Sequence, residues 1–204
     1  MYYIGIDLGK KQDPTAVALV AKRVPHPVYG TTTGSAALTV IGLERVPLGT
    51  PYLDVVERVR ELTSWAEFQG RCSVAVDATG VGTPVVEALR KAVTRCEVNG
   101  VTITGGEHGS QRGMDFTLPK HELISDLQLL FEKGDLGIAA GIPDALALKK
   151  ELLNVRATPR GAGRVRIGAD KYGEHDDLVI AVALACWRSK RKAIGWGEGR
   201  LPGI

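Results

Sequence analysis

The sequence predicts a single α/β domain, and three observations support this expectation. Three β-branched and apolar segments follow one another at residues 2–7, 15–24 and 37–45. After them, segments with helical spacing of apolar residues alternate with short apolar runs. The composition, 44% hydrophobic and 24% charged in 204 residues, is that of a globular chain long enough for one sizeable core. We expect one domain at residues 1–192 and a loose tail at 193–204.

The first part of the chain predicts three antiparallel strands and a helix. Residues 2–7 and 15–24 form the arms of a hairpin around a polar turn, and residues 37–45 form the third strand. Apolar residues then recur at helical spacing from Tyr52 to Phe68. Pro51 stands just ahead, where the first helical turn tolerates proline.

The middle of the chain predicts a parallel crossover. Ser73 to Asp77 is a short apolar strand that ends in a carboxylate. Gly80 and Gly82 follow in a turn, and a second helix is expected from about Pro84 to Val93. Strand, glycine turn and helix in this order are typical of a crossover between parallel strands.

The second half of the chain predicts a mixture of short elements and helices. The expected elements, in order, are a strand at 101–104, a polar glycine-rich loop at 105–117, helices at 120–133 and 142–153, a basic hairpin at about 156–170, and a final helix at 176–191. The final helix is almost wholly apolar, so it must pack on the sheet and carry its acidic beginning to the sheet's edge.

Several classes of protein are excluded by the apolar runs and the cysteines. No apolar run is long enough to cross a bilayer, and the N-terminus lacks the order of a signal peptide, so we expect an intracellular protein. Cys72, Cys96 and Cys186 are far apart and lack the spacing of a zinc site. We therefore expect reduced thiols and no disulfide.

Aspartates stand at the ends of three of the predicted elements. Asp7 ends the first strand, Asp77 ends the crossover strand, and Asp176 and Asp177 open the final helix. An ionised carboxylate at the end of a buried strand is costly unless a cation meets it. Three such ends that converge predict a bound metal.

Each of these motifs has a simpler explanation when taken alone. Asp7 could cap a turn, and Gly80 and Gly82 could supply positive φ rather than cradle a phosphate. That loop also lacks the Lys-Ser/Thr of a P-loop. One acid before the final helix would be an ordinary cap, but the adjacent Asp176 and Asp177 exceed what capping requires.

Basic residues cluster around the predicted hairpin. The net charge of +3 is by itself too weak to indicate a nucleic-acid partner. Arg160, Arg164, Arg166 and Lys171 nevertheless lie close together in the sequence. A solvated charged face would explain them if the carboxylates were absent. Beside a metal site, we expect them to contact DNA phosphates.

Taken together, the motifs resemble the nuclease domain of phage large terminase subunits, within the ribonuclease H-like superfamily. The matching segments are residues 5–9, 13–16, 76–82 and 175–178, and their order covers nearly the whole chain. One departure is large: a large terminase has an ATPase ahead of its nuclease, and no Walker motif exists here, since residues 30–35 lack a lysine. We expect either an excised nuclease half or a stand-alone relative.

The resemblance implies a fold and a function. The implied fold is a mixed five-stranded sheet in the order 3-2-1-4-5, with helices on both faces. The implied function is a DNA endonuclease that uses two Mg²⁺ or Mn²⁺ ions during viral genome packaging. Implied partners are double-stranded DNA, a packaging ATPase domain, the small terminase subunit and the portal, in the cytoplasm of a bacterial host.

Roles for individual residues follow from the resemblance. Asp7 would bridge both metals, Asp77 would bind one and Asp177 the other. Asp176 is a further ligand or supports one, and helical spacing does not decide between the two neighbours. The remaining candidates are Asp13 and Glu174 as additional acids, and Lys120 and His175 for orienting water or phosphate. Carboxylate oxygens without thiolates favour Mg²⁺ or Mn²⁺ over zinc.

Three other functions remain open from the sequence. A RuvC-type junction resolvase would share the metals and the fold. An actin-like or sugar-kinase-type ATP-binding domain would also carry an early Asp-Leu-Gly, yet it needs a second lobe. A non-catalytic DNA-binding ribonuclease H-like module would not need Asp176 and Asp177 together with Asp7 and Asp77.

Overall fold

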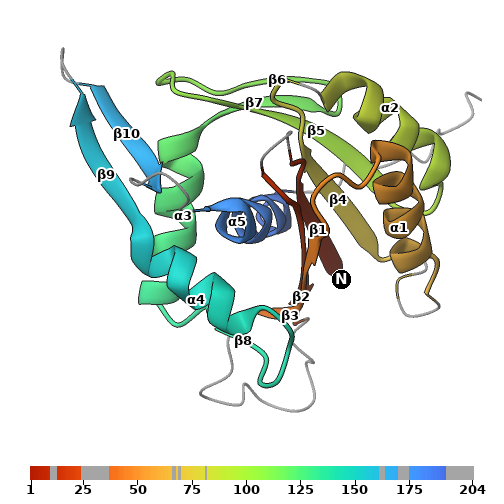
Figure 1. Cartoon of the computed structure of the whole chain (residues 1–204), viewed down its shortest axis with the longest axis horizontal. Coiled ribbons are helices and arrows are strands. Elements are labelled where there is room, and N and C mark those ends of the chain that lie inside the picture. Colours follow the sequence, from red (N-terminus) through yellow and green to blue (C-terminus); the bar gives the residue numbers. More distant parts are fainter. Residues whose placement is uncertain are drawn as a thin grey trace, which may run out of the picture.

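The chain folds around one large sheet, shown in the computed structural model of Figure 1. The structure describes residues 1–9, 13–23, 37–65, 68, 70–80, 82–160, 164–169 and 175–191. For residues 156–160 and 164–169 it describes the backbone.

The sheet has eight strands in the order β6-β7-β5-β4-β1-β2-β3-β8. Its strands are β1 (Tyr2–Asp7), β2 (Thr15–Lys22), β3 (Leu38–Val46), β4 (Cys72–Asp77), β5 (Glu97–Thr104), β6 (Ser110–Arg112), β7 (Asp115–Pro119) and β8 (Leu136–Ile138). The helices are α1 (Tyr52–Ser64), α2 (Gly82–Ala92), α3 (Lys120–Glu132), α4 (Ala145–Asn154) and α5 (Asp177–Ser189). A separate hairpin pairs β9 (Val155–Arg160) with β10 (Arg164–Ala169).

The predicted order of the five central strands is confirmed. β3, β2 and β1 form an antiparallel meander, and β1 then pairs in parallel with β4, which pairs in parallel with β5. Three further strands extend this sheet, β8 beside β3, and β7 and β6 beyond β5. The expectation of a loop throughout residues 105–117 was therefore wrong. Pairing of Gly100 with Asp115 draws this segment into the sheet edge.

Helices cover both faces of the sheet. α1 and α2 pack on one face over Ile4, Ile6 and Val76, whereas α3, α4 and α5 cover the other (Figure 1). All thirteen residues of α5 are buried, because this helix lies between the sheet and the outer helices α3 and α4. A Cβ atom on Gly5 would overlap the carbonyl oxygen of Ala181, so only glycine allows α5 to approach β1 this closely. None of the described helices is long and apolar enough to cross a membrane.

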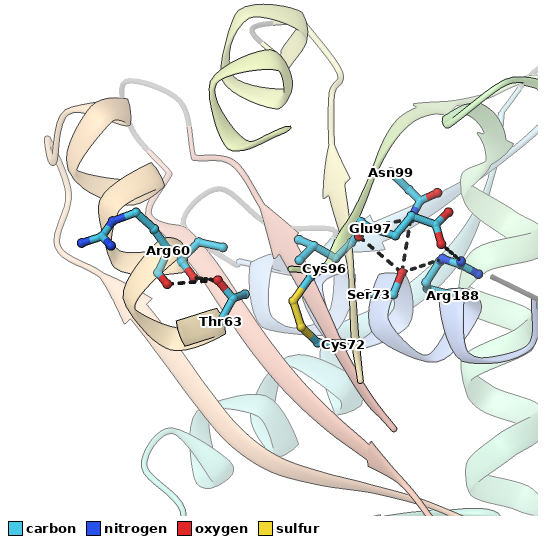
Figure 2. Close-up of a disulfide and its surroundings, with 10 residues drawn as sticks. Arg60, Thr63, Cys72, Ser73, Cys96, Glu97, Asn99 and Arg188 are labelled. Atoms are coloured by element: carbon cyan, nitrogen blue, oxygen red, sulfur yellow. Dashed lines mark hydrogen bonds and ion pairs between the residues drawn. A yellow bond between two sulfur atoms is a disulfide. The ribbon is translucent and has the colours of Figure 1, made fainter. Parts of the chain in front are cut away.

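Two of the three cysteines form a disulfide, which corrects the expectation of reduced thiols. Cys72 and Cys96 are bonded, with their Cα atoms 5.0 Å apart, whereas Cys186 is free and buried (Figure 2). The next residues, Ser73 and Glu97, are register partners on the parallel strands β4 and β5. The crossover through α2 therefore brings together two cysteines that are 24 residues apart.

The predicted basic hairpin is present as β9 and β10. Arg164 stands opposite Arg160, and Arg166 stands opposite Thr158. Strand β9 follows α4 without a connecting loop, and β10 lies against α3 and α4 (Figure 1). Lys171 lies outside the described residues.

Candidate functional site

A pocket of about 280 Å³ opens where β1 and β4 end and α5 begins. Five aspartates line it, together with Lys120 and with Leu8, Gly9, Thr79, Ile103 and Ile180; the aspartates are Asp7, Asp13, Asp77, Asp176 and Asp177. The sheet topology explains this convergence. Pairing of Ile6 with Val76 puts the next residues of β1 and β4, both aspartates, side by side at the carboxyl edge.

Asp7 lies in the most negative part of this pocket. Its pKa is raised well above its ordinary value, first by burial and then by the charges of Asp77, Asp177 and Asp176, which Lys120 only partly offsets. These neighbours act on Asp7 because they stand at the same end of the sheet. The pocket therefore lacks positive charge for the number of carboxylates it gathers.

The turn after β4 orients Asp77. Its Oδ1 accepts a hydrogen bond from the backbone N–H of Thr79 at 2.8 Å. Thr79 is held in turn, because its Oγ1 accepts the N–H of Ile103 at 2.9 Å. Gly80 has φ +85°, which confirms that this glycine serves the turn between β4 and α2.

Asp176 is held by a lysine from another element. Nζ of Lys120, the first residue of α3, donates to Oδ2 of Asp176 at 2.6 Å. Asp176 precedes α5 at the N-cap position, yet its side chain makes no capping hydrogen bond. The sequence predicted more acidic residues at the start of α5 than capping requires. In the structure, the side chain of Asp176 contacts Lys120 and does not cap the helix.

Asp177 is the first residue of α5 and is 7% exposed. Its Oδ2 is buried, accepts no hydrogen bond, and lies 3.4 Å from Nδ1 of His175. The pKa of Asp177 is raised to about 6, chiefly by burial and also by the charges of Asp13 and Asp176, against the opposing effect of His175. The same His175 nitrogen is 3.8 Å from Oδ1 of Asp13, so this histidine stands between two carboxylates.

One buried glutamate of the site was not predicted from the sequence. Glu151 on α4 is 5% exposed, and its Oε2 accepts the backbone N–H groups of Leu178 and Val179 at 3.0 and 3.2 Å. Its Oε1 forms an ion pair with Arg45 of β3. The sequence contains no local signal for this contact, since the bonded residues are 27 and 28 positions apart.

The donor chemistry of the pocket fits a divalent cation, although the acids are not gathered into a finished site. Among the described residues, no three His, Cys, Asp or Glu side chains form a group that could hold a metal ion. Asp176 is engaged by Lys120, and like charges oppose closer approach of the other carboxylates. The unpartnered Oδ2 of Asp177 and the surplus of hard oxygen donors are what a cation would satisfy.

Most of the predicted site residues meet in this pocket. Asp7, Asp77, Asp176, Asp177 and Lys120 line it. His175 lies beside it through its contact with Asp177, and Asp13, which the sequence left open, also lines it. Glu174 and Lys171 lie outside the described residues, as do the side chains of the hairpin arginines.

Comparison with known proteins identifies the fold. No protein-family model and no curated protein sequence matches the chain. Among solved structures, the large terminase nuclease from the thermophilic phage G20c with bound cobalt is 28% identical with a TM-score of 0.62, over 92% of this chain and 81% of that one. The fold is that of the large terminase nuclease domains. The nuclease domain of Thermus phage P74-26 large terminase is 25% identical with a TM-score of 0.59, over 95% and 82% of the two chains.

The terminase nuclease fold also extends to a more distant virus. The human cytomegalovirus terminase nuclease domain is 15% identical with a TM-score of 0.56, over 91% of this chain and 82% of that one. At this identity the likeness concerns the fold alone. The resemblance found in the sequence motifs is thus matched in three dimensions over nearly the whole chain.

Proposed function

We propose that this chain is a DNA endonuclease that depends on two divalent metal ions and cuts viral DNA during genome packaging. The observation that carries the proposal is the pocket that is lined by five aspartates and one lysine. Structures of the similar G20c nuclease hold cobalt or magnesium. We infer Mg²⁺ or Mn²⁺ as the metal of this chain, because the described residues that line the pocket offer carboxylate oxygens and no thiolate.

The aspartates divide the work of holding the ions. Asp7 would hold both ions, Asp77 would hold one, Asp177 would hold the other, and Asp176 would be a further ligand or support one. When bound, such a pair of ions activates the attacking water and stabilises the leaving oxygen of an in-line displacement. The hydrogen bond from the backbone N–H of Thr79 to Oδ1 of Asp77 fixes the orientation of this carboxylate.

Lys120 and His175 assist without binding metal. The ammonium group of Lys120, which donates to Oδ2 of Asp176 at 2.6 Å, would be the cation of the pocket that meets a phosphate oxygen. His175 lies 3.4 Å from Asp177 and can hold the orientation of that carboxylate. The catalytic set is therefore built from β1, β4, α3 and α5.

Duplex DNA is the proposed substrate, and the hairpin is its proposed contact. Arg160 and Arg164 are cross-strand partners, and Arg166 follows two residues later, so their backbone positions share one face of the hairpin. Together with Lys171 they supply charge for phosphates without reading bases. A packaging ATPase domain, the small terminase subunit and the portal are the protein partners we propose, in the host cytoplasm.

Nicking of supercoiled plasmid tests this function. Purified protein should nick the plasmid with Mn²⁺ or Mg²⁺, lose activity in EDTA and regain it when metal is restored. Asp77→Asn should lower the rate by at least ~100-fold. Asp54→Asn, which changes an exposed aspartate on α1, is the matched control and should cut normally. Cleavage that survives exhaustive chelation would remove the metal-dependent mechanism.

A non-catalytic DNA-binding module is the second candidate, since no three acidic or histidine side chains among the described residues are grouped for a metal. Titration calorimetry with Mn²⁺ separates the two. The nuclease should bind the ion and lose this binding in Asp7→Asn. A DNA-binding module should bind DNA with unchanged affinity in EDTA and show no manganese binding. A junction resolvase would instead bind manganese and prefer four-way junctions in a panel of DNA substrates.

A further inference from the structure

The beginning of α5 is capped by a side chain from another helix. The first N–H groups of any helix have no partner within the helix, and an N-cap side chain usually accepts one of them. In α5 the N-cap residue Asp176 does not do so. Glu151 accepts two of these groups instead, from Leu178 and Val179. The cap of the helix that carries Asp177 is thus supplied across a gap of 27 residues.

Arg45 sets the orientation of this remote cap. The Glu151 carboxylate is almost fully buried, and a buried carboxylate is costly without a cationic partner. Its Oε1 pairs with Nη2 of Arg45, while its Oε2 faces the helix. One carboxylate therefore connects three elements, α4, β3 and the first turn of α5.

The remote cap leaves the local acids available for the pocket. Both Asp176 and Asp177 stand where a capping acid would be expected, and either could accept the N–H groups of the first turn if Glu151 did not. Asp176 instead meets Lys120, and Oδ2 of Asp177 accepts no hydrogen bond. The N–H groups of Leu178 and Val179 are thus satisfied without the side chain of either aspartate.

We propose that Glu151, oriented by Arg45, is a positioning residue that holds the first turn of α5 and thereby keeps Asp176 and Asp177 directed to the divalent cation. This inference rests on the proposed function, since it concerns the same metal site. Glu151 touches neither the pocket nor the ion. It acts on metal affinity through the backbone of Leu178 and Val179.

Two double variants that differ only in capping ability test the proposal. Arg45→Met/Glu151→Met replaces the ion pair by apolar side chains of similar length and removes the Glu151 acceptor of the two N–H groups. Arg45→Met/Glu151→Gln also removes both charges but keeps one acceptor oxygen. Because the charges are removed together in both variants, neither leaves an unpaired buried ion. Glu87→Gln, an exposed glutamate on α2, controls for the substitution itself.

The readouts are manganese affinity by calorimetry and thermal unfolding in EDTA, measured on the full chain. The Met/Met variant should bind manganese ~10- to 100-fold more weakly, the usual effect of losing a residue that orients a ligand. The Met/Gln variant should keep most of the affinity. A stabilising role alone would lower the unfolding temperature and leave the affinity of the folded protein unchanged.

Several outcomes overturn the proposal. It fails if Arg45→Met/Glu151→Met binds manganese as tightly as the unaltered protein does. It also fails if Arg45→Met/Glu151→Gln loses as much manganese affinity as Arg45→Met/Glu151→Met does. If the Arg45→Met/Glu151→Met variant does not fold, the single variant Glu151→Gln tests the proposal. Its amide cannot serve both Arg45 and the helix as the carboxylate does. Unchanged manganese affinity in Glu151→Gln contradicts the proposal. If Asp77→Asn abolishes manganese binding while Met/Met keeps it, only this inference fails. If the unaltered protein binds no manganese, the proposed function fails as well.

Discussion

Asp7 bears the electrostatic cost of the metal-free pocket. Its folded-state pKa is raised by burial and by three neighbouring aspartates, so the folded protein resists ionisation of this group more than the unfolded chain does. For a carboxyl with a raised folded-state pKa, its contribution to stability is fully present below the unfolded pKa and is lost as the pH rises through the folded pKa. Without metal, a rise in pH therefore lowers the stability of the fold through Asp7.

Asp7→Asn should remove this destabilisation and should also abolish metal binding. In EDTA at about pH 7.5, the variant should unfold at the same or a higher temperature than the unaltered protein. The difference should shrink as the pH falls below about 3.9, where Asp7 of the unaltered protein becomes protonated in the folded and the unfolded state alike. Manganese binding and DNA cleavage should be lost.

Thermal unfolding in EDTA across this pH range measures the effect. Asp54→Asn on the surface of α1 is the control and should change the unfolding temperature little at any pH. If Asp7→Asn unfolds at a clearly lower temperature, Asp7 is a structural cap and its proposed role in metal binding is wrong.

The sequence predicted which aspartates come together in the pocket, but it did not predict the contacts that hold the surrounding elements in place. Asp7 and Asp77 end apolar strands, and the cost of burying a carboxylate there is visible in the sequence. Glu151 gives no such sign, because a glutamate within a helix looks solvated until the fold brings α5 against it. The disulfide between Cys72 and Cys96 depends in the same way on a strand register that the spacing of the cysteines does not reveal.

At the scale of elements, hydrophobic periodicity predicted the long segments well and the short edge strands poorly. The meander, the crossover and α5 lie within a few residues of their predicted ranges. Strands β6 and β8 have three residues each, too few for any period to emerge. They exist because β7 and β3 offer unpaired edges, which is a property of the assembled sheet.

The hairpin of β9 and β10 carries the prediction that belongs to this scale. Arg160→Ala, Arg164→Ala and Arg166→Ala combined should weaken DNA binding for every sequence alike. Each lost phosphate contact should flatten the dependence of log affinity on log salt by up to ~0.9, because fewer counterions are released. Affinity measured in EDTA at several salt concentrations gives this slope.

The triple arginine variant should keep its manganese affinity, since the hairpin is a sheet separate from the one that ends in the aspartates. Two surface arginines elsewhere provide the control. Arg58 and Arg60 lie on α1, on the opposite face of the main sheet, and their substitution should leave the salt slope unchanged. A slope that is unaltered in the hairpin variant would mean that DNA follows another path, such as the basic residues Lys190 to Lys192.

At the scale of the whole molecule, the candidate site and the contacts that anchor α5 to the sheet lie at opposite ends of this helix. Thirteen residues make this helix ~20 Å long, with the acidic pocket at its N-terminal end. At the other end, Arg188 donates to Oγ of Ser73 at 2.9 Å and pairs with Glu97 at 2.7 Å. These contacts lie beside the disulfide, on strands β4 and β5 (Figure 2). The pocket can therefore hold crowded charge while the opposite end anchors the helix to the sheet.

Arg188→Met should destabilise the protein without affecting the metal site. The Arg188 side chain is 3% exposed, and removing one partner of a buried ion pair leaves the other charge uncompensated, which costs ~3–5 kcal/mol. Lys190→Met, at the C-cap of the same helix, is the matched control. The ion pair of Lys190 with Asp126 is far more exposed and should contribute less than ~1 kcal/mol. Urea unfolding in EDTA measures both free energies of unfolding, and calorimetry at temperatures well below the denaturation midpoint measures manganese affinity.

We expect the folded Arg188→Met protein to bind manganese as the unaltered protein does. A large loss of affinity in that variant would mean that the two ends of α5 are coupled and that its anchoring cannot be separated from the site.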